Sequence, residues 1–183
     1  MEPLTTVKRH TRFVITAAAV AGLIARLAFG LGYWVDKPLT HDESEYLSLA
    51  RNLADGKGFV YDTQGVAASA EHFGRAPLYP AFLAAVVRDR IPPASVPASV
   101  KTVQSLLGSA VVLVIGFTAL RVSGPPAGVA AALLAAFYPP LVWMPSYVLS
   151  ETLYSLLALS SALLLCLSVE QEEGRPHHAD GVG

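Results

Sequence analysis

Two consecutive carboxylates stand in a short polar stretch of an otherwise apolar chain. The stretch at residues 40–58 reads THDESEYLSLARNLADGKG, and its acids include Asp42 and Glu43. A carboxylate can act as a general base toward an attacking hydroxyl or can hold a divalent cation. Further along the chain, Arg75 and Lys101 are of the type that takes up charge on a departing phosphate. This combination favours a reaction in which a phosphate leaves, although the vestibule of a transporter uses the same residue types.

These acids stand at the start of a predicted helix. Thr40 and Glu43 have the spacing of a capping box, which predicts a helix that begins one or two residues after Thr40. We expect this helix to run to about Asp55 and to end at Gly56 in the left-handed conformation. For Glu43 and Glu45, a simple structural reason is available, because acids in a first turn complement the helix dipole.

The apolar residues of the same helix form one stripe, made of Tyr46, Leu49, Ala50 and Leu53. Asp42 stands one turn before Tyr46, and we expect it to extend this stripe onto the buried face. Glu45 and Arg51 are expected to point elsewhere. The helix dipole explains the position of Asp42 along the helix but not its expected burial, so the residue is a candidate for a functional role.

Composition indicates a membrane protein. The chain has 183 residues, is 53% hydrophobic and has a mean hydropathy of +0.48, and its apolar residues come in blocks. The net charge of -1 and the lack of a basic run give no sign of a nucleic-acid partner. Cys166, the single cysteine, stands in an apolar run, so the sequence provides no intrachain disulfide framework.

Four apolar segments are predicted to cross the bilayer, at residues 13–34, 102–120, 127–144 and 152–169. Basic residues precede the first segment, so we expect the N-terminus in the cytoplasm and the chain in the plasma (inner) membrane. That segment is too long for a cleaved signal peptide, and we expect an uncleaved anchor. It contains Arg26, whose charge costs roughly 2.5–3.5 kcal/mol at mid-membrane. We expect Arg26 either to snorkel to the outer interface or to pair with an acid there.

Residues 35–101 are predicted to form a long extracytoplasmic loop. Its apolar block at residues 77–87 is too short to cross, because 11 helical residues cover about 17 Å of a core of about 30 Å. We expect instead an amphipathic juxtamembrane helix that starts near Pro77. The resulting topology gathers five charged residues on the outer face: Asp42, Glu43, Arg75, Lys101 and Glu151. The polar tail at residues 170–183 is predicted to be disordered and cytoplasmic.

Four short motifs occur in a particular order. They are DESEY at residues 42–46 with Ala50, Leu53 and Gly56; RAPLYP at residues 75–80; KTVQ at residues 101–104 with Gly108; and SETLY at residues 150–154. In order and spacing they resemble the opening of the GT-C integral-membrane glycosyltransferases, and within these the protein O-mannosyltransferase and aminoarabinose-transferase-like superfamily. The resemblance covers roughly residues 10–169.

This resemblance implies an all-α partial GT-C module with juxtamembrane helices outside the membrane. It implies a polyprenyl-phosphate-linked sugar donor and an extracytoplasmic lipid, glycan or protein acceptor. Asp42 matches the catalytic acid, with Glu43 beside it, and a divalent metal ion, if one is used, is expected at these two residues. Arg75 matches a contact of the lipid phosphate. Lys101 stands where arginine is usual, which keeps the charge and loses the bidentate fork.

The remaining expectations concern supporting residues and completeness. Glu151 matches the acid that opens the fourth helix, and Tyr46 and Arg26 are expected to support the site. Members of the superfamily continue for several hundred residues, so this chain is expected to be a truncated product. The alternative is a small multi-pass membrane protein without catalysis, such as a scaffold or a transporter subunit.

Overall fold

A computed structural model describes residues 2–60, 75–87 and 94–173 of the chain. Within these residues the chain is helical, with one isolated bridge between Pro38 and Ser95 and no strand. The elements in order are α1 (Glu2–Leu27), the π-helix η1 (Ala28–Tyr33), α2 (His41–Ala54), α3 (Leu78–Val86), α4 (Ala98–Ser123), α5 (Pro125–Phe137), α6 (Pro139–Trp143), the 3-10 helix η2 (Met144–Ser146) and α7 (Glu151–Glu173).

Three helices are long and apolar enough to cross a membrane, at Arg9–Tyr33, Ala98–Ser123 and Glu151–Val169. The bent pair Pro125–Phe137 and Pro139–Ser146 adds a fourth only if both pieces are counted as one span. The fold is therefore that of an all-α membrane protein with three to four spans.

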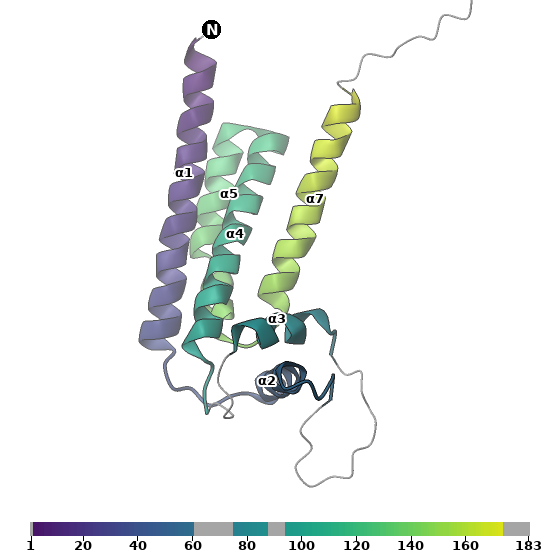
Figure 1. Cartoon of the computed structure of the whole chain (residues 1–183). Helices are drawn as coiled ribbons and strands as arrows, with labels where there is room; N and C mark the ends of the chain where they lie inside the picture. The colour runs from purple at the N-terminus through teal and green to yellow at the C-terminus, as the bar shows by residue number, and fades with distance from the viewer. Residues whose placement is uncertain (1, 61–74, 88–93, 174–183) are drawn as a thin grey trace, which may run out of the picture.

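The long helices form a bundle whose one end is covered by short helices. In Figure 1, α1, α4 and α5 stand side by side, α7 leans away from them, and α2 and α3 lie across one end of the bundle. Small side chains fill the contact between α1, α4 and α5: Ala18, Ala19, Ala132, Ala135 and Ala136 pack with Ile15 and Val112. Gly116 permits the close approach, because a Cβ there would lie 2.8 Å from Ile15 Cγ2.

The third apolar segment is broken, where a continuous helix over residues 127–144 was expected. Helix α5 ends at Phe137, and the chain bends by 59° before the next helical piece. Pro139 and Pro140 have no N–H to continue the hydrogen-bond ladder, and Tyr138 takes the extended conformation (ψ 117°) that a residue before proline prefers. The expectation failed because Pro139 and Pro140 lie inside the segment, five and four residues before its expected end.

The start of α1 and the end of α7 also differ from the expected positions. Helix α1 begins at Glu2, so the basic residues ahead of the first span are helical. Helix α7 continues to Glu173, so residues 170–173 belong to a helix and not to a disordered tail. The Glu and Gln residues of this end are good helix formers, which explains the extension. The rest of the predicted tail, residues 174–183, lies outside the described residues.

Helices α2 and α3, which cover the end of the bundle, form as predicted. Thr40 and Glu43 make both bonds of the capping box of α2, and Gly56 beyond its end has φ 73°. Helix α3 has nine residues, begins directly after Pro77 and lies across the bundle end (Figure 1). A second apolar core holds this layer, made of Tyr46, Leu47, Ala50, Tyr79, Leu83, Val96, Val100 and Val148.

Candidate functional site

The predicted site residues belong to α2, to the residue stretch before α3, and to the parts of α1, α4 and α7 that are nearest to the bundle end covered by α2 and α3 (Figure 1). They form four separate sets of contacts there. Arg75 binds the acids of α2, Glu43 binds the segment before α7, Lys101 binds the segment after η1, and Arg26 shares a cavity with Glu151. The charged residues thus lie toward one end of the bundle, but they do not form a single cluster, and their place on the outer face of a membrane stays a prediction.

Arg75 is held by two carboxylates of α2. Its Nη2 donates to Asp42 Oδ1 and, at 2.7 Å, to Glu45 Oε2, and its Nε donates to the same Glu45 oxygen at 3.0 Å. The guanidinium also lies 4.9 Å from the ring centre of Tyr46. The hydrogen bond to Glu45 raises the pKa of Arg75 above its ordinary value, opposed by partial desolvation and supported by Asp42. A phosphate that binds Arg75 must therefore compete with two acids.

Asp42 does not lie on the buried face, so that expectation is wrong. Its side chain is 51% exposed, whereas Glu43 is 2% exposed. The buried face of α2 is centred on Tyr46, Leu47 and Ala50, and Glu43 precedes that face by one turn. Leu47 is buried but was not part of the predicted stripe, so the buried face of α2 is rotated toward Leu47 and Asp42 lies at its edge. The Asp42 carboxylate is therefore partly open to the surface of the molecule.

Glu43 is a buried carboxylate with both oxygens bonded. Its Oε2 accepts from Thr40 N (2.8 Å) and Thr40 Oγ1 (2.9 Å), and its Oε1 accepts from Val148 N at 2.9 Å. The residue thereby caps α2 and fixes it to the segment that leads into α7. Within the described residues, no group of three or more His, Cys, Asp or Glu is placed to hold a metal ion.

Two residues that the sequence reading did not single out connect the short helices to the bundle. Tyr79 of α3 donates to Gln104 Oε1 at 2.9 Å, and Gln104 Nε2 donates to the carbonyls of Pro145 and Tyr147. Tyr46 meets the Tyr79 ring edge-on at 4.9 Å. Burial raises the pKa of Tyr79, with a smaller contribution from neighbouring negative charge. Tyr79 and Gln104 stand inside two of the four motifs, which was the available signal.

Lys101 is buried at the start of α4, with 5% of its surface exposed. Its Nζ donates to the carbonyl of Trp34, just beyond the π-helix η1. A cavity of about 270 Å³ lies beside it, and Asp36 at its wall has a left-handed φ of 51°. Among the described residues, Lys101 and Arg75 share no hydrogen-bond partner. The two cations expected to hold one phosphate thus have different immediate neighbours.

Arg26 follows neither of the two expected outcomes. It is 1% exposed, and its Nη1 and Nη2 donate to the carbonyls of Ala136 and Ala135, each at 3.2 Å. In a continuous helix these carbonyls would accept from the N–H groups four residues on, which are Pro139 and Pro140. Because proline has no N–H, Arg26 supplies the two donors that the broken helix lacks.

No family model, no curated protein and no solved structure matches the chain.

Proposed function

We propose that the chain is the N-terminal part of a membrane glycosyltransferase that uses a polyprenyl-phosphate-linked sugar donor and an extracytoplasmic acceptor. The supporting observation is that residues from four separate motifs, 42–46, 75–80, 101–104 and 150–154, lie at one end of the bundle (Figure 1). There Tyr46 donates to Ser150 Oγ at 3.4 Å, and Tyr79 donates to Gln104. Contacts between the motifs favour a common role.

Asp42 is the proposed general base. Its carboxylate is half exposed and is held on one side by Arg75, so it can meet an acceptor hydroxyl on the other. Glu43 is a positioning residue in this proposal, because both its oxygens are bonded. For the same reason the pair does not fit a shared divalent ion.

Arg75 is the proposed contact of the donor phosphate. A guanidinium pairs bidentately with phosphate, and such a bond is about twice as strong as a neutral one. The incoming phosphate displaces Asp42 from Arg75 while Glu45 keeps the guanidinium in place through two bonds. Displacement frees the Asp42 carboxylate, so donor binding itself prepares the base. Lys101, buried at the start of α4, is the proposed second source of positive charge for the leaving phosphate.

The catalytic test measures release of polyprenyl phosphate from mannosyl- and aminoarabinosyl-phosphopolyprenol by membranes that contain the chain. Asp42→Asn is expected to lower the rate by on the order of 10²-fold or more, because it removes the base and keeps the shape. Asp55→Asn is the matched control, since Asp55 lies beyond the other end of α2 and pairs with Lys57 at 3.3 Å. A wild-type rate for Asp42→Asn would remove the catalytic role.

We also propose that the N-terminus is cytoplasmic and that α2 and α3 lie outside the plasma membrane. Single cysteines at Ala76, next to α3, and at Ser123, at the far end of α4, then react with a membrane-impermeant reagent from opposite sides. Reaction of both from the same side would contradict this topology.

A non-catalytic multi-pass protein is the second candidate. It is favoured by one observation, which is that Arg75 and Glu43 already have bonded partners within the chain. Arg75→Gln separates the two candidates in a binding assay with polyprenyl phosphate. Loss of binding with normal membrane insertion supports the transferase, and unchanged binding supports the second candidate.

A further inference from the structure

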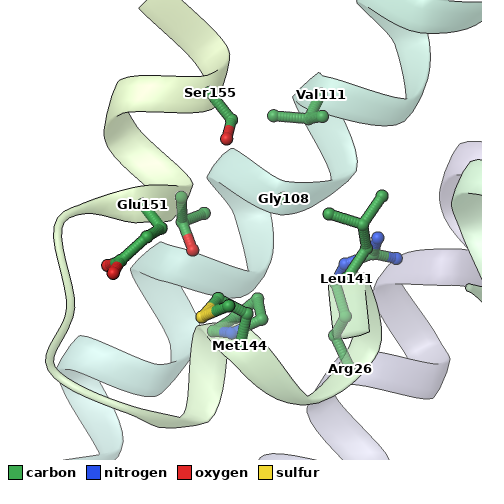
Figure 2. Close-up of a pocket in the computed structure, with 9 residues that line it drawn as sticks. Arg26, Gly108, Val111, Leu141, Met144, Glu151 and Ser155 are labelled. Atoms are coloured by element: carbon green, nitrogen blue, oxygen red, sulfur yellow. The ribbon is translucent and has the colours of Figure 1, made fainter. Parts of the chain in front are cut away.

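We infer that a small cavity beside Arg26 binds a single oxyanion group of the phosphate or carboxylate class. The cavity has a volume of about 60 Å³ and lies between α1, α4, α6 and α7 (Figure 2). Arg26 and Thr152 line it, together with apolar side chains such as Leu141 and Met144. Its volume suits a charged group of a few heavy atoms. This inference does not depend on the transferase activity.

One wall of the cavity carries an unpaired donor of Arg26. The Nη1 and Nη2 atoms are bonded to carbonyls of α5, but Nε has no partner among the described residues. Nε is also the guanidinium atom close to the cavity wall, since a Cβ on Gly108, which lines the cavity, would lie 2.9 Å from it. A glycine at position 108 therefore lets Nε lie against α4, next to the cavity wall.

The wall formed by α7 carries a second unpaired group. Thr152 is 6% exposed, and its Oγ1 has no hydrogen-bond partner within the described part of the chain. A buried donor without an acceptor is unfavourable, because it has lost its hydrogen bonds to water and gained none in the protein. Two such donors line one cavity, from α1 and from α7, and a group with two acceptor oxygens satisfies both.

The charge of Arg26 indicates that the acceptor is an anion. Arg26 lies in a helix apolar enough to span a membrane, and its bonded partners are neutral carbonyls. Among the described residues, no acid lies within ion-pair distance of it. Glu151 lines the cavity, but its carboxylate points away from Arg26 (Figure 2). An oxyanion adds the opposite charge that a buried guanidinium requires and makes charge-assisted bonds.

The anionic group can come from a membrane amphiphile or from a free ion, and binding to the purified chain in neutral detergent distinguishes them. The probes are dodecyl phosphate, dodecanoate, inorganic phosphate and, as the uncharged control, dodecanol. Native mass spectrometry gives the stoichiometry, and a titration gives the Kd. We expect one dodecyl phosphate or dodecanoate per chain, with dodecanol at least about tenfold weaker.

The variants test the wall formed by α7. Thr152→Val keeps the shape, removes the hydroxyl and is expected to weaken oxyanion binding by roughly tenfold. Thr118→Val is its matched control, because Thr118 Oγ1 donates to the carbonyl of Val114 in its own helix. Glu151→Gln is expected to strengthen binding, since it removes a like charge from the cavity wall.

The results distinguish a site for an amphiphile headgroup, a site for a free oxyanion and no oxyanion site. Selective amphiphile binding assigns the cavity to a headgroup, and equally tight inorganic phosphate assigns it to a free oxyanion. Dodecanol binding as tightly as dodecyl phosphate would overturn the inference. Unchanged affinity in Thr152→Val would do the same. If Thr152→Val does not fold, the comparison of dodecanol with dodecyl phosphate on the wild-type chain still decides.

Discussion

The bond between Arg26 and the broken third segment leads to a prediction that needs two changes at once. Arg26→Met removes the guanidinium and keeps most of the side-chain length. Pro139→Ala with Pro140→Ala restores the two backbone N–H groups that Ala135 and Ala136 lack in the native chain. In the restored background the carbonyls have helical donors, so Arg26 is no longer needed for them.

The size of the coupling follows from the two hydrogen bonds. Interhelical hydrogen bonds in membranes contribute about 0.6 kcal/mol on average and up to about 1.7 kcal/mol. Arg26 makes two of them, each at 3.2 Å. Arg26→Met should therefore lower the free energy of unfolding by roughly 1–3 kcal/mol more in the native background than in the double-alanine background.

The measurement is reversible unfolding in micelles of a neutral detergent, titrated with urea, for the four chains of the cycle. The matched control replaces Pro125 and Pro126 instead, because these prolines open α5, where the N–H groups have no helical acceptor. That control should leave the cost of Arg26→Met unchanged. If Arg26→Met lowers the free energy of unfolding by the same amount, within about 0.5 kcal/mol, in the native and double-alanine backgrounds, then Arg26 does not replace the missing backbone donors.

Three further predictions concern stability. Glu43→Gln should speed hydrogen exchange at the amide of Val148, because a charged acceptor there contributes about 1.5–3 kcal/mol; unchanged exchange would contradict the described clamp. Gly116→Ala should destabilise the bundle by roughly 1–3 kcal/mol, since its Cβ would meet two other helices, while Gly32→Ala, with nothing within 4 Å, should not. The pKa of Tyr79 is raised in the folded chain, so its contribution to the free energy of unfolding is fully present below the unfolded pKa of about 10 and is lost as the pH rises from there toward the higher folded pKa. Tyr79→Phe should therefore reduce the fall in the free energy of unfolding at alkaline pH, measured by unfolding the chain at a series of pH values.

Features that depend only on residues close together in the sequence were predictable. The capping box of α2 needs only Thr40 and Glu43, and the length of the 77–87 block excludes a crossing whatever surrounds it. The face of α2 was not predictable in the same way. Which acid is buried depends on where the α3 core and Val148 lie, and Leu47 shows that the buried face is wider than the predicted stripe.

The partners of Arg26 show a second limit. From the sequence we expected Arg26 either to snorkel to the outer interface or to pair with an acid there, and both expectations were wrong. The true partners are backbone carbonyls of two alanines, which have no distinctive side chain. A signal did exist, because Pro139 and Pro140 predict two carbonyls without donors inside an apolar segment. A buried cation in one helix and a proline pair in another could have been matched.

The same contact has a consequence for biosynthesis. Arg26 and its two carbonyl partners are separated by 109 and 110 residues of chain. At a synthesis rate of about 5–20 residues per second, the ribosome needs roughly 5–20 s to make the partners after it has made Arg26. During that interval the nascent first helix contains a guanidinium whose final acceptors do not yet exist. The arginine must stay in contact with water or lipid headgroups until the third segment arrives, so the final depth of the first helix is set late in translation.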